Sequence, residues 1–112
     1  MFSLSYYIPA SDHDRVKQAL FDKGAGKVGQ YDECCWEILG NGQFRAGAGS
    51  HPSIGGIGKL EHVEEYKVEM VCSDKLIREV VETLLKEHPY EQPAYFVHRV
   101  MTIDDIYRSG II

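Results

Sequence analysis

The residues best suited to chemistry in this 112-residue chain are five histidines and three cysteines. Imidazole and thiolate groups bind divalent metals, and a Cys–His pair can supply an activated nucleophile. The spacings that preorganise a metal site, C-x-x-C and H-x-x-x-H, are absent. Adjacent Cys34 and Cys35 fall on opposite faces of a regular strand, so they cannot chelate one metal together. We therefore interpret Cys34 and Cys72 as small buried apolar residues, with metal binding as the alternative.

Two glycine-rich segments resemble phosphate-binding loops but lack the right context. Gly24, Gly26 and Gly29 have the G-x-G-x-x-G spacing of a dinucleotide-binding loop. Such a loop follows a strand and opens a helix, whereas these glycines follow a predicted helix and lead into a predicted strand. Gly58-Lys59 lacks both the Ser or Thr that follows a P-loop lysine and the glycine five residues earlier. Neither segment is assigned to nucleotide binding.

A further set of polar and aromatic residues lies in or beside predicted loops. Arg45 offers a two-pronged guanidinium to a carboxylate or phosphate, and His88 and Glu91 are suited to exchange protons. The glycine-rich loop over residues 47–59 is long for a small domain, and such loops are commonly functional. The alternative is structural, with Tyr90 and Glu91 fixing the turn. The predicted ligand-binding residues are Tyr31, Asp32, Arg45, His51, His88, Tyr90 and Glu91.

The hydrophobic periodicity predicts the elements that position these residues. Apolar runs bounded by glycine and proline predict strands over residues 2–8, 33–39, 43–46, 61–72 and 94–101. Helical spacing predicts one helix from a cap at Ser11 to about Lys23, and a second from a cap at Ser73 or Asp74 to the turn before Pro89. Gly40-Asn41-Gly42 predicts a hairpin turn. A short helical turn is predicted after Thr102.

With the hairpin over residues 33–46 counted as one β unit, the order of these elements is β-α-β-β-α-β, which predicts a single α+β domain over residues 1–112 with a ferredoxin-like fold. Its antiparallel sheet would carry two helices on one face. The opposite face is predicted to carry large residues, namely Tyr7, Leu39, Val71 and either Tyr95 or Phe96. An apolar sheet face that helices do not cover indicates association, so we expect a homo-oligomer.

Charge and composition exclude several classes of function. The formal net charge is −5, and an acidic surface repels nucleic-acid phosphates, so no nucleic-acid partner is expected. No apolar run reaches the length of a membrane span, and no signal-peptide core is expected at the N-terminus. An odd number of cysteines suits a reducing compartment, so the predicted location is the cytoplasm.

Five motifs lie in order along nearly the whole chain. They are Gly24-Ala25-Gly26 with Gly29, Tyr31-Asp32 and Cys34; Gly42-Gln43-Phe44-Arg45; Pro52-Ser53-Ile54-Gly55; Gly58-Lys59-Leu60-Glu61 with Glu64; and His88-Pro89-Tyr90-Glu91 with Ala94-Tyr95. Together they resemble the domain inserted in many bacterial members of the Nif-three-like (Ngg-one-interacting-factor-three-like) family. That inserted domain is similar in fold to CutA and the PII signalling proteins, so the resemblance implies ferredoxin-like subunits that form trimers.

The same resemblance limits what activity is expected. Full-length members of the family carry a two-metal site of histidines and carboxylates in flanking domains that have no counterpart here, so no metal ligand is carried over. We therefore expect a stand-alone, non-enzymatic, oligomeric protein that binds a small ligand or a protein partner at a cleft between subunits, with no catalytic residue and no cofactor. A divalent-metal-binding protein is the first alternative. An accessory piece of a metal-dependent hydrolase, acting in trans, is the second.

Overall fold

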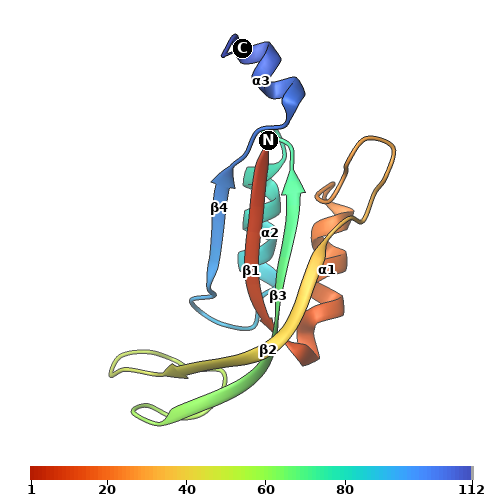
Figure 1. Ribbon diagram of the computed structural model, residues 1–112. Helices are drawn as coiled ribbons and strands as arrows, with labels where there is room; N and C mark the ends of the chain where they lie inside the picture. The colour runs from red at the N-terminus through yellow and green to blue at the C-terminus, as the bar shows by residue number, and fades with distance from the viewer. Residues whose placement is uncertain (112) are drawn as a thin grey trace.

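One antiparallel sheet is the frame of the computed structural model, which describes residues 1–111. Its strands are β1 (Phe2–Pro9), β2 (Trp36–Arg45), β3 (Leu60–Cys72) and β4 (Tyr95–Arg99), in the spatial order β2-β3-β1-β4 (Figure 1). The helices are α1 (His13–Asp22), α2 (Ile77–Glu87) and α3 (Ile103–Ser109), and a short 3-10 turn, η1 (Ala10–Asp12), precedes α1. Each neighbouring pair of strands is antiparallel, which confirms the ferredoxin-like prediction.

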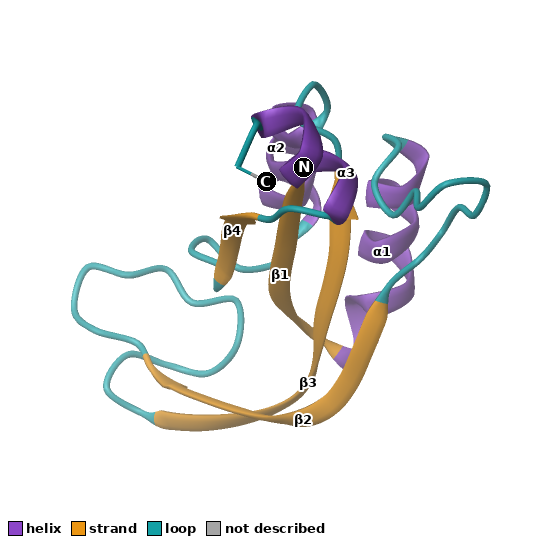
Figure 2. Cartoon of the chain, turned by 45° about the horizontal axis from the view of Figure 1, so that its top comes forward, coloured by secondary structure: helices purple, strands orange, loops and turns teal. Residues whose placement is uncertain are grey.

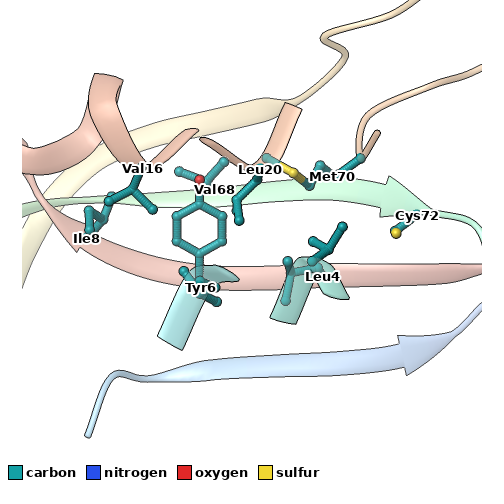
Figure 3. Packing of buried hydrophobic residues seen from close by; sticks show 11 residues of the cluster. Leu4, Tyr6, Ile8, Val16, Leu20, Val68, Met70 and Cys72 are labelled. Atoms are coloured by element: carbon teal, nitrogen blue, oxygen red, sulfur yellow. The ribbon is translucent and has the colours of Figure 1, made fainter. Parts of the chain in front are cut away.

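Helices α1 and α2 lie side by side on one face of the sheet (Figure 2). The core between helices and sheet follows the predicted alternation, with Leu4, Tyr6 and Ile8 of β1 beside Val68 and Met70 of β3 (Figure 3). Cys72 is buried in this core as expected, whereas Cys34, which was also predicted to be buried, is only half-buried in the loop before β2. From the helices, buried residues of α1 and α2 close it: Val16, Leu20, Val80 and Leu84. Within residues 1–111 no helix is long and apolar enough to cross a membrane.

The hairpin turn predicted at Gly40-Asn41-Gly42 is wrong. Strand β2 continues without interruption through these residues and pairs with β3 along its whole length, with Gly40 opposite Glu65 and Gly42 opposite Val63. A two-residue turn of the common types needs positive φ, and neither glycine has it. The predicted short strands over residues 33–39 and 43–46 therefore merge into one strand, and residues 46–59 form the connection to β3.

Gly42 has a different role within β2, where a neighbouring side chain approaches the strand backbone. The side chain of Glu65 lies over Gly42, and a Cβ atom at that position would displace its carboxylate end. Glycine within a strand often marks such a close approach. The long β2–β3 pair bends away from the helices, and its far end curls round to the side of the sheet where β4 begins (Figure 2).

The uncovered sheet face differs in part from the prediction. Cross-strand partners share a face, so Tyr7, Val71 and Phe96 point away from the core as expected. Leu39 pairs with Tyr66, so it lies on the helix side and the prediction for it is wrong. Of the two alternatives on β4, Tyr95 pairs with Tyr6 on the helix side, and Phe96 is the residue on the open face. On β2 the open face instead carries Trp36 and Ile38, which are 61% and 52% exposed.

The phase of β2 is set by its polar residues. Glu37 points to the helix side, where Lys17 Nζ of α1 donates to its Oε1 at 2.8 Å and His13 Nε2 lies 3.0 Å from its Oε2. The pKa of Glu37 is lowered chiefly by the Lys17 hydrogen bond, although burial opposes the shift. A carboxylate held this way turns its neighbours Trp36 and Ile38 outward, and the hydrophobic pattern alone does not reveal this.

Only one of the predicted helix caps forms. Thr102 and Asp105 make a reciprocal capping box at the start of α3, and Gly110 ends that helix in the left-handed conformation. At α1 the Ser11 hydroxyl instead donates to the Asp12 carboxylate, and η1 leads into the helix. Helix α2 begins at Ile77 without a side-chain cap.

Candidate functional site

A pocket of about 330 Å³ lies between the far end of the β2–β3 hairpin and the connection from α2 to β4. The hairpin supplies Phe44, Arg45 and Glu65, and the connection supplies Tyr90 and Glu91. Tyr7 of β1 and loop residues 46–54 complete the lining. Segments 40 residues apart in sequence therefore share one cavity within a single chain, whereas the sequence analysis expected the cleft between subunits.

One hydrogen bond ties the two sides together. The backbone N–H of His51 in the 46–59 loop donates to Glu91 Oε1 at 2.8 Å. Charge-assisted bonds of this kind are among the stronger ones, so the loop is held over the pocket by a definite contact. His51 acts here through its backbone, while the adjacent Ser50 and Pro52 contribute to the pocket wall.

His88 lies beneath the pocket rather than in it. Its side chain is buried, with Nε2 2.6 Å from the Tyr7 carbonyl oxygen, and its Nδ1 accepts the Tyr90 backbone N–H at 3.1 Å. An Nδ1 that accepts leaves the proton on Nε2, which donates to the carbonyl, so the ring is neutral. Burial lowers the pKa of His88, although the Tyr7 carbonyl opposes the shift. With both nitrogens engaged, His88 has no free atom for proton exchange with Glu91.

The pocket floor is aromatic. The ring of Tyr90 lies 6.0 Å from that of Phe44 and 5.0 Å from that of His88, both in tilted arrangements. Such edge-to-face contacts stabilise the turn beyond the area they bury. The Tyr90 hydroxyl is buried without a hydrogen-bond partner among residues 1–111. Its pKa is raised by burial and, to a smaller extent, by the negative charge of Glu65.

Glu65 is a pocket residue that the sequence analysis missed. It is half-buried on β3, and burial raises the pKa of its carboxyl. Period-two alternation assigns Glu65 to the sheet face opposite the core, where an acidic side chain is expected to be exposed to solvent. Only the curled hairpin shows that it faces a cavity.

Two of the predicted ligand-binding residues lie elsewhere. Tyr31 and Asp32 sit in the loop between α1 and β2 and do not line the pocket. That loop is pinned near the end of β3, because the Gly26 N–H donates to the Val71 carbonyl at 2.8 Å. Figure 1 shows it at the opposite end of the sheet from the hairpin tip. Of the seven predicted residues, the structure brings together Arg45, His51, Tyr90 and Glu91, with His88 as their support.

The cysteines form no evident reactive centre. Burial raises the pKa values of Cys35 and Cys72, so both thiols stay protonated at neutral pH. The Cys34 thiol donates to the Asp32 carbonyl oxygen at 3.6 Å, and the Cys35 sulfur lies 3.8 Å from Glu37 Oε1. Within the described part of the chain, no three His, Cys, Asp or Glu side chains gather as a metal-donor set.

Comparison with known proteins identifies sequence relatives. No family model matches the chain. It is 40% identical over 89 residues to the GTP cyclohydrolase 1 type 2 homolog of Mycobacterium tuberculosis, covering 80% of this chain and 24% of that protein. The homolog of the same name from Bacillus subtilis is 36% identical over 97 residues, covering 87% of this chain and 26% of the relative. The chain thus spans about a quarter of the length of the curated relatives it matches.

Solved structures give the same picture. A Bacillus cereus protein related to NIF3 superimposes with a TM-score of 0.76 and 32% identity, covering 90% of this chain and 26% of that one. CutA1 from Pyrococcus horikoshii matches with a TM-score of 0.66 and 17% identity over 97% of this chain and 92% of its own. The PII-like protein CutA from Nostoc matches with a TM-score of 0.66 and 14% identity, over 97% and 89% of the two chains.

The fold therefore defines this chain as a ferredoxin-like α+β domain of the CutA and PII-like kind. Its sequence is homologous to one segment of the NIF3 family, represented by the GTP cyclohydrolase 1 type 2 homologs. Both findings confirm the resemblance stated from the sequence motifs.

The buried, neutral His88 predicts a specific pH dependence of stability. The unfolded chain binds a proton at the ordinary histidine pKa of about 6.5, while the folded chain, whose His88 pKa is lower, resists it. The His88 contribution to the unfolding free energy is therefore complete above pH 6.5 or so and is lost as the pH falls toward the folded pKa, with a slope of at most about 1.4 kcal/mol per unit.

Urea denaturation of the wild type and His88→Gln between pH 7.5 and 5 measures this, with His62→Gln at an exposed position as control. The wild type and the control should lose stability over this range more steeply than His88→Gln. Parallel curves for all three proteins would show that His88 is not buried as a neutral ring.

Proposed function

We propose that this chain is a non-enzymatic, homo-oligomeric protein that binds a small ligand in the pocket between the β2–β3 hairpin and the α2–β4 connection. The pocket carries this proposal, because it is a preformed cavity with an aromatic floor and a few polar groups, as small-molecule sites usually are. A protein partner at the same cleft is the other outcome that a binding experiment would reveal.

The polar groups of the pocket support a ligand with an anionic group. Arg45 lines the pocket, is exposed, and forms no ion pair within residues 1–111. A guanidinium without a protein partner is available to a carboxylate or phosphate in bidentate geometry. The surrounding groups are already fixed: Glu91 by the His51 N–H, and the Tyr90 backbone by His88. A preformed site of this kind lowers the cost of ordering on binding.

The open sheet face supports assembly. Trp36, Glu69, Ser5 and Phe96 lie in one row across all four strands, with aromatic residues at both edges. Trp36 and Phe96 are 61% and 56% exposed, and α1 and α2 lie on the other face. Exposed aromatic residues of this kind are enriched at protein interfaces. The resemblance to CutA and PII proteins favours a trimer, and the three free cysteines agree with a cytoplasmic location.

Assembly through this face predicts a variant that separates the subunits. Trp36→Glu puts a charge on the open face and should convert the oligomer to a monomer at micromolar concentration, because a buried unpaired charge is costly. Leu85→Glu, at an exposed position on α2, should leave the mass unchanged. Light scattering coupled to size exclusion gives the masses. A wild-type monomer would contradict the assembly, and a wild-type dimer would contradict the trimer.

Ligand binding is tested with a deproteinised bacterial extract as the source of small molecules. Native mass spectrometry of the wild type should show a small-molecule adduct. Ser53→Trp places a large ring in the pocket wall and should remove the adduct. Ser109→Trp at the end of α3 is the control and should retain it. A persistent adduct in Ser53→Trp would place binding elsewhere, and no adduct in any protein would overturn the small-ligand proposal.

The names of the relatives raise hydrolysis as a separate question. We propose that this chain alone does not act on GTP, because its described residues hold no three-donor metal set and it corresponds to only about a quarter of those proteins. Incubation with GTP and Mn²⁺ or Zn²⁺, followed by chromatography of the nucleotides, should show no product above a protein-free blank. Turnover that co-purifies with the protein and is lost in Arg45→Gln would contradict this.

A further inference from the structure

The pocket contains a carboxylate that the protein itself does not neutralise. Glu65 lines the cavity on β3, and no ion pair to it forms within residues 1–111. Its side chain lies over Gly42 of the neighbouring strand, in a space that any residue with a Cβ would fill. The sequence thus keeps room for an acidic group that receives no cation from the fold. Half-buried charges are expensive unless something pairs with them.

The surroundings of Glu65 suit a positive charge. Tyr7, Phe44 and Tyr90 supply aromatic walls to the same cavity, and aromatic faces attract cations. The pocket also contains Glu91, so its charged side chains are two carboxylates against one guanidinium. Arg45 pairs with Leu60 in register, five residues along β3 from Glu65, a span of about 17 Å along a regular strand. Arg45 therefore lies at the other end of the hairpin segment and forms no ion pair with Glu65.

We propose that the Glu65 end of the pocket is a subsite for a protonated amine, held by the Glu65 carboxylate against the rings of Tyr7, Phe44 and Tyr90. This inference rests on the proposed ligand-binding function and adds the chemical class of the ligand: an organic ammonium compound. An anionic group on the same molecule belongs at the Arg45 end. A neutral hydrogen-bond donor would leave the carboxylate charge uncompensated, and a second anion would be repelled by it.

A matched set of five-carbon probes tests the charge preference. Cadaverine carries two ammonium groups, 5-aminopentanoate one ammonium and one carboxylate, and glutarate two carboxylates. Each is titrated into isotopically labelled protein, and NMR shifts of the pocket residues report binding. The variants are Glu65→Gln, which keeps the shape and removes the charge, and Glu64→Gln, an exposed neighbour with the same change in net charge.

Cadaverine and 5-aminopentanoate should bind the wild type and Glu64→Gln alike, and at least tenfold more weakly to Glu65→Gln, as expected for the loss of a charge-assisted contact. Glutarate should bind at least tenfold more weakly than 5-aminopentanoate. Equal losses in both variants would indicate a long-range charge effect and overturn the subsite. Preferential binding of glutarate would overturn the ammonium subsite and leave a pocket for anions. If no probe binds, the proposal of an ammonium subsite is wrong. The extract experiment with Ser53→Trp tests the ligand-binding function separately.

Discussion

The two hydrogen bonds of His88 are the constraint on which the candidate site depends. This one ring joins the end of α2, the last residues of β1 and the start of the α2–β4 connection, because it donates to the Tyr7 carbonyl and accepts from the Tyr90 N–H. Both bonds require a neutral imidazole with the proton on one particular nitrogen. Pro89 follows directly and cannot continue the helix, so the chain leaves α2 in a fixed direction. Tyr90 and Glu91 are placed in the pocket as a result.

A second polar group has a comparable influence at the other end of β2. The Glu37 carboxylate is held by Lys17 and lies beside His13, whose ring stacks on Tyr66 at 4.1 Å. The buried Tyr6 hydroxyl has no partner among the described residues, and burial together with the nearby Cys35 and Glu37 raises its pKa. This polar cluster fixes which face of β2 meets the helices.

The sequence predicted those features that depend on local pattern. Alternation placed Leu4, Tyr6 and Ile8 in the core, and Thr102 was recognised as a helix cap. The hairpin turn was mislocated because Gly40-Asn41-Gly42 has turn composition, while its actual role is to let the Glu65 side chain approach β2. The face of Leu39 was misassigned because the phase of β2 depends on its pairing with β3 and on the contact between Glu37 and Lys17 of α1, and the sequence of a single strand contains neither.

The sequence also predicted part of the candidate site. Arg45, Tyr90 and Glu91 share the pocket and the His51 backbone reaches it, as the polar loop residues indicated. Tyr31 and Asp32 were included because they lie in a glycine-rich loop, but that loop is fixed to the opposite end of β3. Glu65 was omitted because its surroundings come from the bend of a long hairpin. Such curvature arises from twist summed over many residues and leaves no single-residue signal.

Helix α3 is less stable than the sheet and can unfold locally without it. It projects beyond the end of the sheet (Figure 1), and Ile103 and Tyr107 on its surface are exposed. A seven-residue helix is too short to be stable by itself, and its caps add only local stabilisation. We therefore expect its backbone amides to exchange with solvent through local fraying that leaves the sheet intact, and those of β1, which pairs with strands on both sides, to exchange only when the whole domain opens. A surface that packs against α3 would therefore stabilise this helix without changing the stability of the sheet.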